Sequence, residues 1–275
     1  EAHRLNDKSG MFHNLGENQI KEIINAALCS IFFIDESQRV TLSDIGSVAE
    51  IRRWADELES EVMEMELVSQ FRCNGSDGYL AWLDDVLEIR ETANFDLKDI
   101  DYDIKIVDSP NEVRDLIIER NRVHNRARIL AGYCWAWIKA GQNNTDVHDI
   151  KIGDFGMSWN LGNTTTFAID ETSVNEVGCI HTSQGLEFDY AGVIIGDDMR
   201  YQDGHIVTDF TKRAKTDQSL KGIKKLYREN PEKALKEADE IIKNTYRTLM
   251  TRGMKGCYIY CTDQKLADYL KECLK

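Results

Sequence analysis

The chain has 275 residues, of which 42% are hydrophobic, and its formal net charge at pH 7 is -14. This length and apolar content suit one large globular domain or two small ones. The acidic balance argues against a protein that coats nucleic acid without selectivity, because neutralising phosphates requires a surplus of lysine and arginine. No run of about 18 apolar residues occurs, so we expect no membrane-spanning helix and no membrane partner.

The N-terminal sequence and the cysteines favour a cytoplasmic protein. The first ten residues, EAHRLNDKSG, lack the basic start and apolar centre of a secretion signal and contain no initiator methionine. We therefore expect the sequence to be part of a longer protein. The seven cysteines form no C-x-x-C pair, and Cys29, Cys134 and Cys179 lie among apolar residues. This pattern is typical of reduced thiols, so we expect a cytoplasmic protein without a metal site.

The first part of the chain is predicted to alternate between helices and buried strands. Apolar residues at helical spacing across residues 20–27 lead into a β-rich run at 30–35. A second helix at about 48–59 leads into a second strand at 64–69. Each strand is short and apolar, which is typical of strands that are covered on both faces.

The remaining elements continue this alternation. We expect helices at 78–89, from Ser109 and Pro110 onward, and from Asp263 onward, and strands at 103–108, 127–133, 176–180, 192–196 and 256–261. Helices that alternate with strands predict α/β layers around a largely parallel sheet. Glycine and polar residues mark loops at 72–78 and 139–146, and the first loop is the predicted domain boundary.

Positive charge is concentrated in one segment of this acidic chain. From Lys212 to Lys255 there are 13 Lys and Arg against 6 Asp and Glu. A basic segment of this kind can bind a polyanion locally. The alternative is a solvated helix with interleaved ion pairs, which the run KALKEADEIIK at 233–243 would form.

Polar residues beside the predicted strands form the candidate site, because open parallel sheets hold ligands at the carboxyl ends of their strands. Three runs follow predicted strands: DESQ at 35–38, QFR at 70–72 and HTSQGLEFD at 181–189. A fourth run, LMTRG at 249–253, precedes the last strand. Each run alone could be a turn or a surface charge. Arg252 by itself would most simply be a solvated charge on a helix.

Taken in order, these runs resemble the motifs of superfamily 1 helicases, and more closely those of the schlafen-like DNA/RNA helicase domain family. The resemblance covers nearly the whole chain. EAHRL at 1–5 looks like the end of a Walker B motif, FFIDESQRV at 32–40 like motif III, LVSQFR at 67–72 like motif IV, GCIHTSQGLEFDY at 178–190 like motif V and NTYRTLMTRGMKG at 244–256 like motif VI. Motif V is the most specific match, with Gln184 in place of the usual lysine.

The resemblance implies a RecA-like fold: a largely parallel sheet flanked by helices, with a partial first domain and a complete second domain. The remnant of the first RecA-like domain would occupy residues 1–70, and the second domain would occupy residues 71–275. The implied function is the C-terminal part of a nucleic-acid-dependent ATPase of the helicase or translocase type.

The resemblance also implies catalytic roles. Glu1 would orient the attacking water, and Gln38 would sense the γ-phosphate. Arg72 and Arg252 would contact that phosphate, since a forked, permanently charged guanidinium suits the charge that spreads on a transferred phosphoryl group. Gln38 could instead be an ordinary polar residue of a loop.

Other residues of motif V are implied to bind ligands. Gly185 and Glu187 would contact the nucleotide, with the Glu187 carboxylate accepting a hydrogen bond from the ribose. His181, Thr182 and Ser183 would contact the nucleic-acid backbone. Glu187 could instead cap the turn that follows it.

The sequence lacks the loop that normally holds the phosphates of ATP. No G-x-x-x-x-G-K-[ST] run occurs, and the first Asp of the Walker B motif is missing before Glu1. We therefore expect ATP and Mg²⁺ to bind in the longer protein, and we expect no cofactor and no ATP hydrolysis in these 275 residues alone. The expected partners are single-stranded DNA or RNA and the N-terminal Walker A segment of the same protein.

Aromatic side chains could add base stacking, which is worth about 1 to 3 kcal/mol per base. Trp135 and Trp137 share one face of a strand-like run, which favours a place in the core. Trp159 lies in a less regular stretch and is the better candidate for a nucleic-acid contact.

Two other functions remain open at this point. A regulatory nucleotide-binding module would keep the two-domain fold without moving along a strand. A nuclease would use the acid-rich stretch 83–103 and the pair Asp197 and Asp198 as metal ligands. No spaced set of acids and a lysine accompanies them, and DDMRYQDG at 197–204 is more simply a polar loop.

Overall fold

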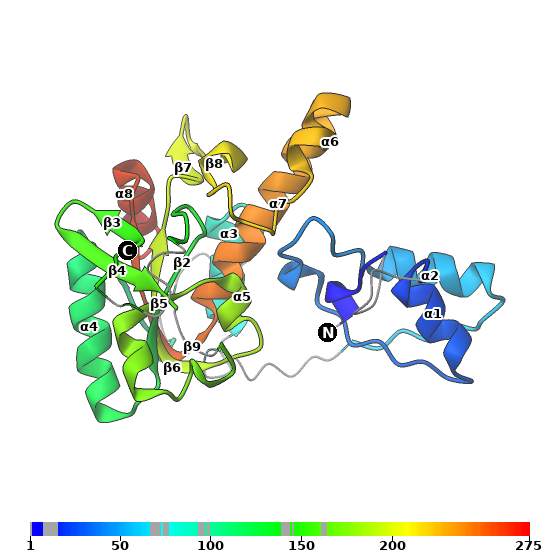
Figure 1. The fold of residues 1–275 in the computed structure, drawn as a ribbon, viewed down its shortest axis with the longest axis horizontal. Helices are drawn as coiled ribbons and strands as arrows, with labels where there is room; N and C mark the ends of the chain where they lie inside the picture. Colours follow the sequence, from blue (N-terminus) through cyan, green and yellow to red (C-terminus); the bar gives the residue numbers. More distant parts are fainter. Residues whose placement is uncertain are drawn as a thin grey trace. The chain divides into compact units, whose positions relative to one another are not determined.

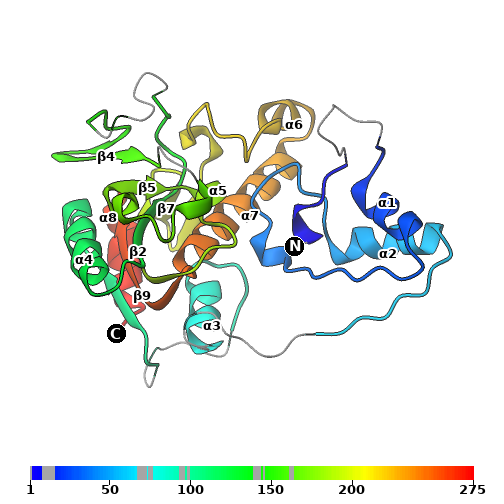
Figure 2. The same cartoon turned by 60° about the horizontal axis from the view of Figure 1, so that its bottom comes forward.

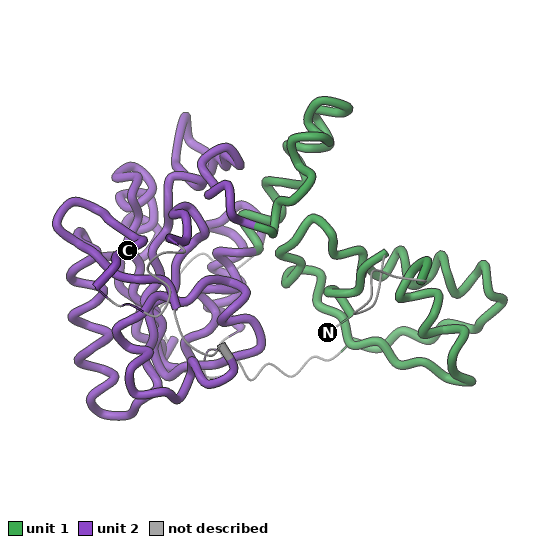
Figure 3. The backbone as a smooth tube through the Cα atoms, in the orientation of Figure 1, with its two compact units in different colours: residues 1–68, 218–244 green, residues 69–217, 245–275 purple. Residues whose placement is uncertain are grey.

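The structure is a computed structural model that describes residues 2–7, 16–66, 73, 77–92, 97, 100–138, 144, 146–160 and 164–275. The chain forms two compact units, shown in Figure 3: unit 1 consists of Glu1–Val68 and Gln218–Asn244, and unit 2 consists of Ser69–Asp217 and Thr245–Lys275. The assignment of Gln218–Asn244 to unit 1 was not expected from the sequence.

The described residues of unit 2 form a seven-stranded sheet in the order β1-β9-β6-β2-β5-β4-β3 (Figure 1). Neighbouring strands are parallel except β3 and β4, which pair antiparallel at one edge. The strands are β1 (Asp103–Ile106), β2 (Ala127–Ala131), β3 (Ile150–Ile152), β4 (Phe155–Trp159), β5 (Glu176–Gly178), β6 (Phe188–Ile195) and β9 (Gly253–Cys261). The predicted α/β class with a largely parallel sheet is confirmed.

Helices cover both faces of this sheet. In Figures 1 and 2, α4 lies on one side of the central strands, while α3 and the part of α7 that belongs to unit 2 lie on the other. Consistent with this cover, β2 is buried along its whole length. The helices of unit 2 are α3 (Asp77–Val86), α4 (Pro110–Val123), α5 (Ile180–Ser183) and α8 (Gln264–Glu272), and α7 (Pro231–Met250) enters unit 2 at Thr245.

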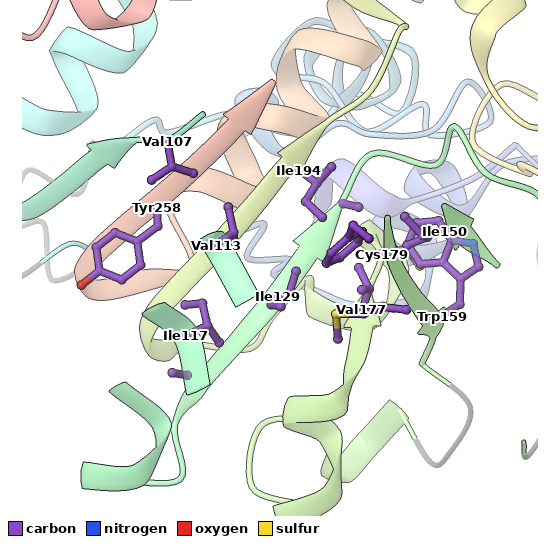
Figure 4. Close-up of a cluster of buried hydrophobic side chains, with 14 of the residues drawn as sticks. Val107, Val113, Ile117, Ile129, Ile150, Trp159, Val177, Cys179, Ile194 and Tyr258 are labelled. Atoms are coloured by element: carbon purple, nitrogen blue, oxygen red, sulfur yellow. The ribbon is translucent and has the colours of Figure 1, made fainter. Parts of the chain in front are cut away.

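Helix α4 begins where the sequence predicts. The Ser109 hydroxyl accepts a hydrogen bond from the Asn111 amide at 3.2 Å, and Pro110 occupies the first turn, where its missing N–H costs nothing. Val113 and Ile117 are four residues apart and therefore face the same way, toward the sheet. Figure 4 shows both side chains in the buried apolar cluster that joins α4 to the central strands.

Unit 1 contains α1 (Gln19–Ala26), α2 (Val48–Glu57), α6 (Ile223–Glu229) and the first part of α7. The Asn18 side chain caps α1 by accepting from the amides of Ile20 and Lys21, and the Ser47 hydroxyl caps α2 by accepting from the Glu50 amide. The predicted helices at 20–27 and 48–59 are confirmed. None of the helices in the described ranges is long and apolar enough to cross a membrane.

Two predicted strands of unit 1 are wrong in the described residues. Residues 30–34 and 64–66 have no strand pairing, and Ile31 and Phe33 are 77% and 65% exposed. A strand forms only when a neighbour pairs with its backbone, and the described part of unit 1 contains no strand that could do so. Residues 67–69 of the second run, like the motif IV arginine that follows, lie outside the described residues.

The sequence analysis missed a hairpin in unit 2. The run 197–204, which was expected to be a polar loop, contains β7 (Met199–Gln202), which pairs antiparallel with β8 (His205–Thr208). The two-residue turn is Asp203-Gly204, with φ angles of 54° and 88°. Asp-Gly is a strong sequence signal for such a turn, so the hairpin was predictable.

Gly192 allows α4 to approach the centre of the sheet. A Cβ atom at this position would lie 2.6 Å from Val113 Cγ1 and 2.8 Å from Ile117 Cγ1. Val113 and Ile117 are both fully buried, so neither can move aside without displacing its neighbours.

The first prediction follows from this contact. Gly192→Ala should lower the free energy of unfolding by roughly 1 to 3 kcal/mol, because the added methyl group overpacks the interface with α4. Adding Val113→Ala should restore part of the loss, giving a favourable coupling in a double-mutant cycle measured by urea unfolding. Additive losses would show that the methyl group does not meet α4.

Candidate functional site

The N-terminal ends of β6 and β9 bring motif V and motif VI together. The two strands are parallel neighbours, with Phe188 in register with Gly253. The Phe188 amide donates to the carbonyl of Arg252 at 2.8 Å. The residue before β9, Arg252, therefore lies beside the residue before β6, Glu187, as the resemblance implied.

Arg252 is not a solvated surface charge. The residue is 1% exposed, and its Nε donates to the Thr248 carbonyl at 3.0 Å while Nη1 donates to the Leu186 carbonyl at 3.2 Å. Thr248 lies in the last turn of α7, where carbonyl groups lack helical partners and a cation is favoured by the helix dipole. One guanidinium thus caps α7 and binds the turn before β6.

The turn between α5 and β6 presents the candidate nucleotide contacts. The Leu186 amide donates to the Ser183 carbonyl at 3.0 Å, and Gly185 has a φ of 85°, a left-handed conformation that favours glycine. Gly185 and Glu187 are both exposed. The turn therefore offers an open backbone and a carboxylate next to the buried Arg252.

Of the three implied nucleic-acid contacts in α5, only His181 is exposed. The Ser183 hydroxyl is fully buried and donates to the Cys179 carbonyl at 3.0 Å. Thr182 is 7% exposed, with its hydroxyl 3.5 Å from the Cys179 sulfur. Both side chains thus contact Cys179, the residue before α5, and the roles of His181, Thr182 and Ser183 in nucleic-acid binding stay predictions.

Gln38 belongs to unit 1 and is held in a defined orientation. It ends the short 3-10 helix Glu36–Gln38, which Asp35 caps by accepting from the Ser37 amide at 3.1 Å. The Gln38 side-chain amide donates to the Asp35 carboxylate at 2.7 Å, and the residue is 5% exposed. Gln38 is thus an oriented, buried amide, unlike the side chain of an ordinary loop residue.

Glu1 and Arg72 lie outside the described residues, so their predicted roles rest on the sequence. The residue that follows Arg72 is described. Cys73 is fully buried, and its thiol lies 3.8 Å from the Thr251 carbonyl, one residue before Arg252. Residues 73 and 251, far apart in sequence, therefore meet at the same end of β9.

Trp159 is corrected from a base-stacking candidate to a core residue. It lies in β4, is 2% exposed, and its indole nitrogen donates to the Trp135 carbonyl at 3.0 Å. Its ring stacks on Tyr133 with centroids 5.1 Å apart. Trp135 and Trp137 pack against the same apolar cluster. Because β4 joins the sheet, Trp159 has no face open for a base.

Sequence reasoning missed two ion-pair networks that hold α7 in unit 2. Asp198 is fully buried and accepts a hydrogen bond from Tyr246, and its carboxylate lies 2.6 Å from Arg213 Nε. Arg213 also pairs with Asp217 at 3.1 Å. Burial acts to lower the pKa of Arg213, but the two carboxylates outweigh it and raise the pKa. Asp198 therefore belongs to an internal ion pair of unit 2.

The second network joins α7 to α3. Arg247 pairs with the buried carboxylate of Asp84 through Nε and Nη2, and Arg90 pairs with the same carboxylate at 2.7 Å. In the described residues, no group of three His, Cys, Asp or Glu side chains could hold a metal ion. The acid-rich stretch 83–103 thus contributes an internal ion pair in its described part.

Comparisons with known proteins identify a matching family and a curated protein of similar sequence. The model of the schlafen group 3 DNA/RNA helicase domain matches residues 1–263. The uncharacterised protein YPL245W of Saccharomyces cerevisiae is 25% identical over 293 aligned residues, which cover 98% of this chain and 63% of that protein. The chain thus spans less than two thirds of this relative's length.

A solved structure is similar at a greater distance. It is the C-terminal domain of a possible DNA helicase from Lactobacillus plantarum WCFS1, 10% identical, with 73% of this chain and 95% of that chain covered and a TM-score of 0.29. This TM-score is too low to support any inference. The family match rests instead on nearly the whole length of the sequence. The chain therefore belongs to the schlafen group 3 DNA/RNA helicase domain family.

Proposed function

We propose that the chain is the C-terminal part of a nucleic-acid-dependent ATPase of the helicase or translocase type. The observation that most supports this proposal is the contact between motifs V and VI. The hydrogen bond from Arg252 to Leu186 spans 66 positions and places a guanidinium beside the exposed Glu187. Local structure does not produce such a contact, and phosphoryl transfer requires a positioned cation.

In this proposal, ATP and Mg²⁺ are bound jointly by a phosphate-binding loop elsewhere in the longer protein and by residues of this chain. The nucleotide supplies the phosphoryl group. Arg252 and Arg72 contact the γ-phosphate, and Glu187 and Gly185 contact the nucleoside. Gln38, a residue of unit 1, senses the γ-phosphate. Glu1 orients the attacking water.

The burial of Arg252 adds a condition to this proposal. A guanidinium that is 1% exposed and bonded to the Leu186 carbonyl reaches a phosphate only if the turn at 184–187 moves. Gly185 makes such a movement easier, because glycine tolerates both signs of φ. The N–H groups of Arg252 would then donate to a charged phosphate oxygen instead of a carbonyl oxygen. The charged oxygen is the stronger acceptor.

The proposed partner within the longer protein is the segment that carries the phosphate-binding loop. Support comes from unit 1, where Leu28, Ile31, Phe33, Met63 and Met65 are each at least 65% exposed. Clustered apolar exposure of this kind marks surfaces that another polypeptide covers. Ile31, Phe33 and Met65 lie in runs that were predicted to be buried strands, so strand pairing is the proposed form of cover.

The alternative function is a regulatory module that binds nucleotide without translocation. One observation favours it: Arg252 already satisfies the end of α7, so a structural role would account for its burial. The two functions differ in turnover and in the response to nucleic acid.

The second prediction separates these functions. Residues 1–275 alone should show no ATP hydrolysis above background, because they contain no phosphate-binding loop. A longer protein that includes the loop should hydrolyse ATP, and single-stranded DNA or RNA should accelerate it in a steady-state assay. Nucleotide binding without stimulated turnover would favour the regulatory module, and turnover by the 275 residues would contradict the fragment interpretation.

The third prediction concerns Arg252 in that longer protein. Arg252→Ala should lower ATP turnover by roughly 10³-fold or more, as for other arginine fingers, and Arg252→Lys should restore little because an ammonium lacks the planar fork. Either change should also destabilise unit 2 by roughly 1 to 3 kcal/mol, because buried carbonyls lose a donor.

Arg247→Lys is the matched control for this experiment. Arg247 is also a buried arginine of α7, and its guanidinium pairs with the Asp84 carboxylate of α3. It should lower stability without a comparable loss of turnover. Equal losses in both variants would show that Arg252 acts only through the fold.

The fourth prediction concerns the exposed part of the basic segment. Lys221, Lys224 and Lys225 are exposed, whereas Arg213 and Lys243 are buried and paired with carboxylates. Replacing the three lysines with Glu should weaken binding to a single strand and reduce its salt dependence, because phosphate contacts release counterions. Fluorescence anisotropy at several salt concentrations measures both. Unchanged affinity would identify these lysines as a solvated surface.

A further inference from the structure

A second candidate binding site lies in unit 2. Two of its residues, Asp189 and Lys255, belong to motifs V and VI, but the resemblance assigns no role to either of them. A cavity of about 580 Å³ opens where α4 ends and where β2, β6 and β9 begin. Its lining residues are His124, Asn125, Arg126, Ile169, Asp189 and Lys255. Segments from four parts of the chain therefore converge here.

The cavity carries more positive than negative charge. Among the described residues, Asp189 is the only acidic one that lines it, and this carboxylate pairs with Lys255 at 2.7 Å, with His124 at 3.4 Å and with Arg126 at 3.6 Å. Burial acts to raise the pKa of Asp189, but the interactions with Lys255, His124 and Arg126 together outweigh it and lower the pKa. One carboxylate is thus shared among two permanent cations and an imidazole.

The cations remain open to a ligand. The side chains of Lys255 and Arg126 are 52% and 53% exposed, whereas that of Asp189 is 13% exposed. The Arg126 distance of 3.6 Å is longer than a hydrogen bond, so Asp189 does not satisfy the Arg126 guanidinium. An incoming anion would meet the cations before the carboxylate.

A buried arginine that is bonded to Asn125 of the cavity lining adds to the positive charge. Arg128 is fully buried, and in the described residues its hydrogen bonds go to neutral acceptors: the carbonyls of Phe167, Ala127 and Asp170 and the side-chain oxygens of Asn121 and Asn125. Burial lowers the pKa of this guanidinium to about 10, with the more distant carboxylates of Asp170 and Glu176 opposing the shift. Arg128 therefore stays charged at neutral pH.

Asn125 connects this buried charge to the cavity wall. Its side-chain oxygen accepts from Arg128 at 3.0 Å, and its nitrogen donates to the Ile169 carbonyl at 2.7 Å. Ile169 lines the cavity and is 68% exposed. The wall thus offers an apolar surface next to cations, which suits a phosphate attached to an organic group better than a bare inorganic anion.

We propose that this cavity binds the phosphate group of a nucleotide or of a nucleic-acid strand through Lys255 and Arg126, with Ile169 contacting the attached nucleoside. The site is additional to the proposed ATPase site, since it uses neither Arg252 nor Glu187. The cavity prefers an anion because its lining cations face a single competing carboxylate among the described residues. The buried Arg128, which is bonded to the lining residue Asn125, adds positive charge nearby.

The test uses the 275-residue chain and three probes: a 20-residue oligothymidylate, AMP and inorganic phosphate. The double variant Lys255→Ala with Arg126→Ala should weaken binding of the responsive probe roughly tenfold. Lys265→Ala, which removes an exposed lysine of α8, is the control and should change nothing. For the oligonucleotide, the slope of log affinity against log salt should become shallower by about 0.7 for each phosphate that the variant no longer neutralises.

The probes distinguish the sources of the phosphate. An effect on the oligonucleotide alone identifies a strand, and an effect on AMP identifies a free nucleotide. Asp189→Asn removes the competing negative charge and should tighten binding of the probe. If Lys255 and Arg126 serve only to pair with Asp189, the affinity should stay unchanged. Thermal unfolding checks that the variants fold. If the double variant binds all three probes as the control does, the proposal is overturned, and ATP hydrolysis plays no part in this result.

Discussion

One buried guanidinium, that of Arg252, fixes the end of the sheet on which the candidate site depends. It satisfies a carbonyl of the last turn of α7 and a carbonyl of the turn before β6, so a helix end and a strand start are joined by one side chain. Because its charge is nearly excluded from water, leaving either carbonyl unpaired would cost about 1 to 3 kcal/mol. In the proposed function the same donors serve a phosphate, so nucleotide binding and the position of the turn at 184–187 compete for one group. Such competition links the site to a conformational change, because the ligand binds the two arrangements with different affinity.

Two further contacts hold α7 in the position from which Arg252 bonds to both carbonyls. Tyr246 bonds to Asp198, and Arg247 pairs with Asp84 one residue later along the helix. Burying such pairs costs desolvation, so they add little net stability, but removing one partner would cost roughly 3 to 5 kcal/mol. Their effect is therefore on geometry. Rotation or sliding of α7 would remove one hydrogen-bonding partner from each of these buried carboxylates, which restricts where the arginine at its end can lie.

Features that depend on local sequence patterns were predicted correctly. Predictions were wrong where the structure of a segment depends on residues that are distant in the sequence. The strands β1, β2, β6 and β9 and the start of α4 at Ser109 and Pro110 were predicted, since apolar runs and capping residues act locally. The meeting of Arg252 and Glu187 was predicted only through the family resemblance. The run at 30–35 has a strand's composition but no pairing strand in the described part of unit 1. Trp159 was misjudged because the pairing of β4 with β5, and hence its burial, cannot be read from the residues around it. The hairpin β7–β8 was missed, although its Asp-Gly turn was visible.

The basic segment shows why a charge count needs a structure. Its surplus of positive residues is a property of the linear sequence, yet the structure divides them into two classes. Three arginines, Arg213, Arg247 and Arg252, are buried and donate fixed hydrogen bonds within unit 2. The exposed cations of α6 and of the start of α7 are mostly lysines: Lys224, Lys225, Lys233 and Lys236, with Arg228. A planar guanidinium suits a fixed buried geometry, whereas a flexible, hydrated ammonium suits a contact that is made and released. The chemistry of the two cations thus matches their places, and only the exposed class is available for the transient phosphate contacts that movement along a strand would require.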